Sequence, residues 1–199
     1  PGEDRYFEAD AECCSWGPLF SDYENDGDDD MYLATGWFKG HYNHNDPNLM
    51  LLRDDEMFLN IKPASPEGFR ANSRGAAAVD LDNDGAIDLV VNNFGSPPRV
   101  LRNVQRTDNR WVKVRLRAGR DNRQGIGATI RAFPQGLTPI TRRVTCGSAY
   151  LSQDDTTVTI GIGGNDRLDR IEVHWPGGRT QIVERPMPAG SIVEVEEPR

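Results

Sequence analysis

The stretch DLDNDGAIDL at residues 80–89 indicates both a fold and a chemistry for this chain. Its four aspartates occupy positions 1, 3, 5 and 9 of a loop, and Gly85 occupies position 6. Alternate residues of a tight loop can turn their carboxylates inward together, and glycine permits the sharp turn at position 6. Calcium takes about six to eight oxygen ligands, so the pattern predicts a calcium site. With water completing the shell, the expected ligands are Asp80, Asp82, Asp84, Asp88 and the backbone carbonyl of Ala86.

The same pattern occurs 58 residues earlier, in DYENDGDDDM at residues 22–31. Glu24 stands where the later loop has Asp82, and its side chain is one methylene longer, which predicts a distorted or looser site. Six acids within nine residues repel one another strongly unless a cation is bound. The expected ligands of this other calcium site are Asp22, Glu24, Asp26, Asp30 and the backbone carbonyl of Asp28.

The repeat extends beyond the loops, because Gly17 recurs as Gly75 with the same spacing. Each loop is followed by a short apolar segment, residues 31–34 and 89–91, that reads as a strand. A period of this size suits a four-stranded propeller blade. Two blades cannot close a ring, since propellers typically need about four to eight. We therefore expect either further blades upstream or another mode of packing.

The second half of the chain reads as a series of short strands separated by turn-like Gly, Pro and Asn segments. Such a pattern predicts an antiparallel β-sandwich-like domain, and an all-β fold for the whole chain. We expect a repeat region with two calcium loops over residues 1–103 and a β domain over residues 104–199. The predicted strands of the second part are residues 111–116, 126–133, 142–146, 157–162, 171–175, 180–183 and 191–195.

Charge and composition exclude several classes of function. Residues 1–103 have a net charge of −12 and residues 104–199 one of +4. The acidic first part argues against a nucleic-acid partner, and we interpret the scattered arginines of the second part as solvated. No apolar run approaches the roughly 20 residues of a membrane span. The cysteines Cys13, Cys14 and Cys146 form no metal-binding spacing, and their disulfide pairing stays open.

Two other interpretations of the loops are an EF-hand and a solvated acidic turn. An EF-hand takes a glutamate at position 12 between two helices, whereas position 12 here is Leu33 or Val91 in an apparent strand. A solvated acidic turn is the plain alternative, since Asp, Asn and Gly are common in turns. Two matches in one register favour a bound ion over that alternative.

Catalysis and sugar binding would each require a recognisable set of residues. Ser148 and Ser152 lack a nucleophile-elbow motif, and Cys146 has no recognisable histidine partner motif, so we expect no enzyme. A carbohydrate-binding module would need an exposed aromatic residue beside a calcium site. Tyr23, within the earlier loop, is the best candidate for that role.

These motifs resemble two known families. The loops at residues 22–31 and 80–89 are similar to FG-GAP (VCBS-type) repeats, whose loops bind calcium on β-propeller blades. Residues 109–116, 122–128, 147–153 and 175–178 resemble the ASPIC/UnbV domain of cartilage acidic protein-like and bacterial secreted proteins. The resemblance implies a secreted, extracellular or cell-surface setting.

We therefore expect a calcium-binding extracellular structural or adhesion module with two Ca²⁺ sites. Its partner would be an extracellular protein, a glycan or a second copy of the chain, with no nucleic acid and no membrane span. The alternatives are a self-assembling extracellular fibre subunit and a calcium-dependent carbohydrate-binding module.

Overall fold

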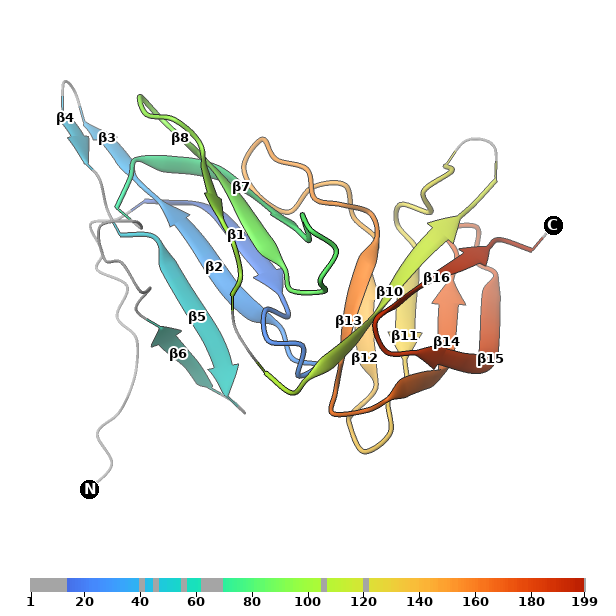
Figure 1. Cartoon of the computed structure of the whole chain (residues 1–199). Coiled ribbons are helices and arrows are strands. Elements are labelled where there is room, and N and C mark those ends of the chain that lie inside the picture. Colours follow the sequence, from blue (N-terminus) through green and yellow to red (C-terminus); the bar gives the residue numbers. More distant parts are fainter. Residues whose placement is uncertain are drawn as a thin grey trace.

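The computed structural model describes residues 14–39, 42–44, 47–54, 57–61, 70–104, 107–119 and 122–198. These residues form sixteen strands and no helix, which confirms the all-β prediction. No helix long and apolar enough to cross a membrane occurs in this part of the chain. Figure 1 shows two lobes: the first lobe holds the described residues up to 104, and the second lobe those from 107 onward.

Two blade-like antiparallel sheets and a hairpin make up the first lobe. The four-stranded sheet has the order β1-β2-β5-β6 and the three-stranded sheet the order β7-β8-β9, and none of the sheets in the described part is closed. The strands are β1 (Ser15–Ser21), β2 (Asp30–Thr35), β3 (Trp37–Lys39), β4 (Tyr42–His44), β5 (Leu49–Asp54), β6 (Met57–Ile61), β7 (Ser73–Val79), β8 (Asp88–Asn93) and β9 (Arg99–Leu101).

The two sheets of the first lobe share one core. Alternate residues of β1, β2, β7 and β8 are buried in it, including Leu19, Tyr32, Ala76 and Val91. A buried chain of hydrogen bonds also joins the repeats. Its links are Thr35 N to Asn48 Oδ1 (2.8 Å), Asn48 Nδ2 to Ser73 Oγ (2.9 Å) and Ser73 Oγ to Asn93 Oδ1 (2.8 Å).

The second lobe is a sandwich of two sheets with the orders β13-β10-β16 and β12-β11-β14-β15. Period-two alternation puts Val112 and Val114 of β10 inside, facing Ile130 and Ile171 of the opposite sheet. The strands are β10 (Arg110–Arg117), β11 (Thr129–Ala132), β12 (Ile140–Arg143), β13 (Val158–Gly163), β14 (Arg167–His174), β15 (Thr180–Pro188) and β16 (Ser191–Glu196).

The second lobe departs from the prediction in one pairing and in some strand ends. β15 and β16 are consecutive in the chain but belong to opposite sheets, so they do not pair as an antiparallel hairpin. β16 pairs instead with β10, and the two strands are parallel. β11 is shorter than predicted, since a turn that includes the hydrogen bond from Ala128 N to Gly125 O precedes it. β12 begins and ends earlier than predicted, and β14 and β15 are longer.

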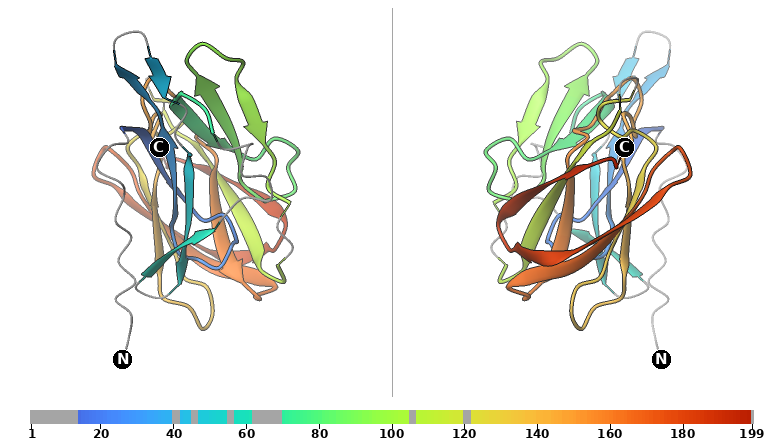
Figure 2. Two further views of the ribbon diagram at one scale, coloured as in Figure 1. Left: turned by 90° about the vertical axis from the view of Figure 1, so that its left-hand side faces the viewer. Right: turned by 90° about the vertical axis from the view of Figure 1, so that its right-hand side faces the viewer.

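The lobes meet along the acidic loops and along one long loop of the second lobe. This loop, residues 146–157, reaches from the second lobe to β1 and β7 (Figure 1). A Cβ on Gly17 would lie 3.1 Å from Ala149 Cβ, and one on Gly75 only 2.4 Å from the Tyr150 carbonyl oxygen. The two glycines that mark the repeat therefore make room for the second lobe. In the side views of Figure 2 the β3–β4 hairpin and the β8–β9 connection project from the same end of the molecule.

Candidate metal centre

Each acidic loop connects the two strands of an antiparallel hairpin. The register pairs Ser21 with Asp30 before and after the first loop, and Val79 with Asp88 around the second. The loops also share their backbone conformation. The φ angles are +58° and +62° at Asn25 and Asn83, and +102° and +91° at Gly27 and Gly85. Asparagine and glycine tolerate this region best, so the repeated Asn-Asp-Gly segment gives both loops the same turn.

Three hydrogen bonds inside each loop correspond at the 58-residue spacing, whereas a fourth differs: Asp26 N donates to Asp22 Oδ1 at 3.1 Å, and Asp84 N donates to Asp82 Oδ1 at 3.4 Å. In each loop the carboxylates at positions 1, 5 and 9 accept bonds from backbone N–H groups, which hold these side chains in place. In the first loop these bonds join Gly27 N to Asp22 Oδ2 (2.9 Å), Asp28 N to Asp26 Oδ1 (2.9 Å) and Tyr23 N to Asp30 Oδ2 (2.8 Å). In the second they join Gly85 N to Asp80 Oδ2 (2.6 Å), Ala86 N to Asp84 Oδ1 (2.9 Å) and Leu81 N to Asp88 Oδ2 (3.1 Å).

The ninth-position aspartate ties the first loop to β5 and the second loop to the segment just after β9. Asp30 Oδ1 accepts a bond from Arg53 N at 2.8 Å, and Asp88 Oδ1 accepts one from Asn103 N at 2.7 Å. Both aspartates are buried. Their hydrogen bonds therefore fix the end of each loop against the rest of its repeat.

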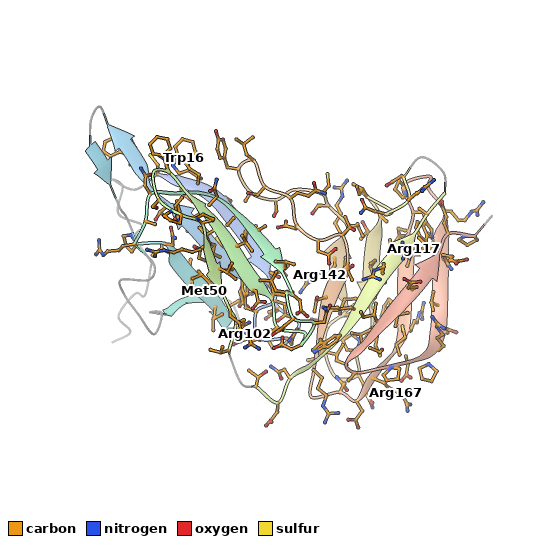
Figure 3. All side chains as sticks on the ribbon, turned by 45° about the horizontal axis from the view of Figure 1, so that its top comes forward. Trp16, Met50, Arg102, Arg117, Arg142 and Arg167 are labelled. Atoms are coloured by element: carbon orange, nitrogen blue, oxygen red, sulfur yellow. The ribbon has the colours of Figure 1, made fainter. Side chains whose placement is uncertain are left out.

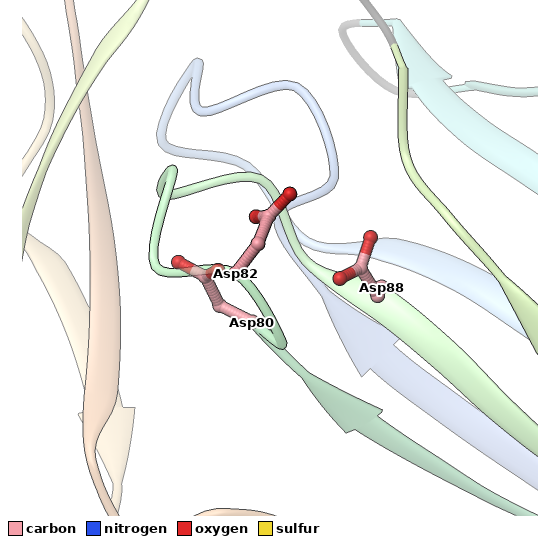
Figure 4. A group of neighbouring side chains, drawn as sticks. All are labelled: Asp80, Asp82 and Asp88. Carbon is pink, nitrogen blue, oxygen red and sulfur yellow. The ribbon is translucent and has the colours of Figure 1, made fainter.

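The second loop brings together three of its predicted ligands. One carboxylate oxygen from each of Asp80, Asp82 and Asp88 lies within 4.8 Å of the others (Figure 4). Asp80 Oδ1 is buried and has no hydrogen-bond partner among the described residues. A buried carboxylate oxygen without a partner is costly, and a cation would satisfy it. The cluster can therefore hold a metal ion.

The other predicted ligands of the second loop lie outside this group. Asp84 is not part of the cluster; its Oδ2 lies 3.7 Å from Arg102, which also contacts Asp82 at 2.5 Å. The Ala86 backbone N–H is bonded to Asp84, and the structure assigns no ligand role to the Ala86 carbonyl.

In the first loop no comparable group of three ligand atoms forms within the described part of the chain. Asp22 and Asp30 are both buried there, and burial raises the pKa of Asp22 to about 7 and that of Asp30 to about 6. Each carboxylate would be stabilised in its charged form by a nearby cation. The backbone carbonyl of Glu24 accepts hydrogen bonds from two residues of the second lobe, Thr107 Oγ1 (3.3 Å) and Asn109 Nδ2 (3.0 Å).

Cations of the second lobe lie against position 1 of each loop. Lys113 Nζ is 2.5 Å from Asp80 Oδ2, and both side chains are buried. Arg142 Nη2 is 3.9 Å from Asp22 Oδ2 and 3.0 Å from Asp29 Oδ1 (Figure 3). The interpretation of the arginines of this part as solvated is therefore wrong for Arg142, because the packing of the two lobes covers it.

Further contacts hold the loops against β10 and β13 and against each other. Trp111 Nε1 donates to the Asp84 carbonyl at 3.0 Å, and Gly163 N donates to the Asn25 carbonyl at 3.1 Å. Asn25 Nδ2 donates to the Gly85 carbonyl at 3.1 Å, so the two loops lie side by side. Apart from Trp111 at the start of a predicted strand, no sequence pattern indicated these contacts.

The structure also decides two smaller expectations. Tyr23 was predicted to be exposed, and this is wrong: it is 2% exposed, because its ring packs into the core of the first lobe. Of the described cysteines, Cys14 and Cys146 are exposed free thiols, and Cys13 lies outside the described residues. The structure therefore supplies no disulfide between Cys14 and Cys146.

Comparisons with known proteins fit this arrangement. The family model "FG-GAP-like repeat" matches residues 22–91, and the family model "ASPIC and UnbV" matches residues 118–199. The chain thus matches an FG-GAP-like repeat followed by an ASPIC/UnbV domain. Cartilage acidic protein 1 of Xenopus tropicalis is 26% identical in an alignment of 192 residues, and the alignment covers 89% of this chain. This chain spans 27% of the length of that protein.

The first lobe thus contains the FG-GAP-like match, and the second lobe contains the ASPIC/UnbV match, which begins after β10. We call the whole second lobe the ASPIC/UnbV domain, after the family model that matches most of it. The acidic loops belong to the FG-GAP-like match and face the ASPIC/UnbV domain across the contact between the lobes. The predicted division at residue 103 falls between the two matched segments and stays a prediction.

Proposed function

We propose that this chain is a calcium-binding structural or adhesion module of an extracellular protein, and that it is not an enzyme. One observation carries the proposal. The second loop holds three converging carboxylates, one of which keeps a buried oxygen without a hydrogen-bond partner among the described residues. The first loop supports a second site because its turn and its hydrogen bonds repeat those of the second loop.

Calcium suits these ligands better than magnesium does, because it accepts flexible shells of about six to eight oxygens whereas magnesium demands a small octahedron. In the second loop Asp80, Asp82 and Asp88 would hold the ion, with Asp84 and the Ala86 carbonyl as the further ligands that the sequence predicts. Bound calcium would neutralise the carboxylates and tie the loop to its strands. A ligand at a hundredfold excess over its dissociation constant stabilises the folded state by about 2.7 kcal/mol.

The extracellular setting is supported by the domain pair and by the relative, whose name places it in cartilage. Extracellular calcium modules commonly bind with dissociation constants of about 10⁻⁴–10⁻³ M. Such an affinity would leave each loop about half occupied or more at the millimolar calcium outside cells. The partner would then be an extracellular protein, a glycan or another copy of the chain.

Isothermal titration calorimetry with calcium, together with elemental analysis, tests the proposal. We expect two calcium ions per chain, and one per chain in an Asp82→Asn variant. Asp169→Asn is the matched control, since Asp169 is an exposed aspartate of β14 that pairs with Arg167. No binding to the unaltered chain, or equal loss of binding in both variants, would contradict the proposal.

An exposed aromatic cluster favours glycan binding as a second candidate function. Trp16 and Tyr150 stack edge to face with centroids 5.2 Å apart, and the Arg74 guanidinium lies over the rings of Trp16 and Phe94. Tyr150 is 45% and Phe94 is 53% exposed. Quenching of tryptophan fluorescence by a panel of oligosaccharides, abolished by Tyr150→Ala, would support this function. An unchanged response in that variant would exclude this cluster as the sugar site.

A further inference from the structure

We propose that Lys113 and Arg142 of the ASPIC/UnbV domain are positioning residues for the two loops. Through them, binding of a divalent cation to the loops and docking of the ASPIC/UnbV domain would strengthen each other. The inference rests on the proposed calcium function, because it assigns a role to residues that surround the predicted ligands.

The two oxygens of Asp80 have different surroundings. Oδ2 receives the Gly85 N–H at 2.6 Å and the Lys113 ammonium at 2.5 Å, whereas Oδ1 has no hydrogen-bond partner within the described residues. The Lys113 side chain is 6% exposed and that of Asp80 is 3% exposed, so solvent competes little for this pair. Lys113 thereby fixes the orientation of the carboxylate and leaves Oδ1 for a cation. Residues that orient a metal ligand in this way typically change metal affinity by about 10–100-fold.

Arg142 has the corresponding place at the first loop. Its Nη2 atom lies near Asp22, which is position 1 of that loop as Asp80 is of the other. The same guanidinium donates to the Gly27 carbonyl at 3.4 Å and pairs with Asp29 at 3.0 Å. Two different strands of one domain, β10 and β12, therefore bring a cation to the same position of two repeated loops. A general attraction between an acidic and a basic surface would not require this correspondence.

The charge around the second loop leaves room for a divalent cation beside Lys113. Its four aspartates are accompanied by two nearby cations, Arg102 on Asp82 and Asp84 and Lys113 on Asp80. Two negative charges are left over, which is the charge that one calcium ion would neutralise. Lys113 and the ion therefore complement each other on opposite oxygens of one carboxylate.

Close packing connects the loop backbone to the ASPIC/UnbV domain. The Trp111 indole donates to the Asp84 carbonyl, and a Cβ on Gly85 would lie 1.7 Å from the same indole nitrogen. A Cβ on Gly161 of β13 would lie 2.1 Å from Asp22 Oδ2. A cation that orders the loops also orders the surface on which β10 and β13 rest. Coupling between two binding events is reciprocal, so docking must raise cation affinity by the same factor.

Calcium titration of the full chain tests the role of Lys113. We expect Lys113→Met to weaken calcium binding at one of the two sites by about 10-fold or more, and Lys113→Arg to restore most of it. Arg117→Met is the matched control. Arg117 lies on the same strand and the same face, and it pairs instead with Glu194 at 3.1 Å, where both side chains are exposed. This control removes the same charge and should leave both affinities unchanged.

Hydrogen exchange measured by mass spectrometry tests the reverse direction. Calcium should slow amide exchange in β10 (residues 110–117) of the unaltered chain. Asp82→Asn should abolish that response, although the Asp82 side chain pairs with Arg102 of its own repeat and not with the ASPIC/UnbV domain. If the amide exchange rate of β10 in the unaltered chain is the same with and without calcium, the coupling is wrong.

The outcomes separate this inference from the proposed function. If the unaltered chain binds calcium and Lys113→Met binds it equally well, the positioning role is wrong and the calcium function stands. If the unaltered chain binds no calcium, the calcium function fails, and the coupling fails with it. If circular dichroism shows that Lys113→Met does not fold, Arg142→Met, which removes the corresponding cation beside Asp22 of the first loop, takes its place in the same comparison.

Discussion

Substitution of Gly85 by alanine should destabilise the protein more than the same substitution at Gly27. Both glycines are position 6 of an acidic loop, with φ of +91° and +102°, so an alanine is strained at either place. That strain costs about 1–2 kcal/mol. The added methyl group, however, meets different neighbours at the two positions.

At Gly27 a Cβ would lie 3.0 Å from Ile140 Cδ1, which is the tip of a flexible side chain that can move aside. At Gly85 it would lie 1.7 Å from Nε1 of the Trp111 indole and 2.0 Å from the ring carbon Cε2. Such an overlap forces the loop and β10 apart and adds about 1–3 kcal/mol. We expect Gly27→Ala to cost about 1–2 kcal/mol of unfolding free energy, and Gly85→Ala about 2–5 kcal/mol.

Urea unfolding in saturating calcium measures both costs, and a double-mutant cycle identifies the cause. Trp111→Ala removes the ring, so Gly85→Ala should cost less in that background, by about 1–3 kcal/mol. Gly27→Ala should cost the same in either background. Equal costs for the two alanines, or a cost of Gly85→Ala that does not depend on Trp111, would refute the idea that the second loop is pressed against β10.

Three further predictions concern the long loop of residues 146–157, the pH dependence of stability, and self-assembly. Gly75→Ala should loosen the long loop of the ASPIC/UnbV domain, because its Cβ would lie 2.4 Å from the Tyr150 carbonyl, and limited proteolysis should cut residues 146–157 faster; unchanged cleavage would contradict that contact. Burial raises the pKa of Asp22 to about 7 and of Asp30 to about 6, so without calcium the folded state holds protons that the unfolded state releases. Urea unfolding in EGTA should therefore show stability falling as the pH rises from 5 to 8, and calcium should stabilise more at pH 8 than at pH 5, the opposite trend being the contrary result. If the chain is a fibre subunit, sedimentation at high concentration should show calcium-dependent polymers, whereas a species of constant size would exclude that alternative.

Local sequence pattern was enough to predict the repeat region. The 58-residue spacing fixed the equivalence of the loops, and the structure repeats it in the φ angles of Asn25 and Asn83 and in the hydrogen bonds of each loop. Period-two alternation also located β10, since Val112 and Val114 are buried in the sandwich core. These features depend on residues that are close in the sequence, where turn chemistry and side-chain alternation act directly.

The contact between the lobes could not be predicted in the same way. Arg142 and Asp29 are 113 residues apart, and their pairing depends on how two separately folded units pack. The alternation of β10 does put Lys113 on the face away from the sandwich core, but it does not say what covers that face. Tyr23 shows the same limit: it is buried, whereas Leu81, its counterpart in the second loop, is 51% exposed. The repeats share a turn but pack against different neighbours.

The parallel pairing of β16 with β10 has a similar origin. Alternation at residues 191–195 marks a strand with one buried face, and Val193 and Val195 are buried as that pattern predicts. Its direction depends on the route of the chain between the two sheets, which the pattern does not encode. Direction and partner are therefore properties of the sandwich as a whole.

A thermal melt of the full chain in calcium, in magnesium and in EGTA asks whether the loops are calcium sites, with Asp82→Asn as the comparison. At a hundredfold excess over its dissociation constant, we expect calcium to raise the melting temperature by about 5–10 °C over EGTA, magnesium to do much less, and the variant to respond less to calcium. The same melting temperature in calcium and in EGTA, with no metal found by elemental analysis, would contradict the assignment of the loops as calcium sites. The loops would then be acidic turns held by hydrogen bonds and by the cations of the ASPIC/UnbV domain.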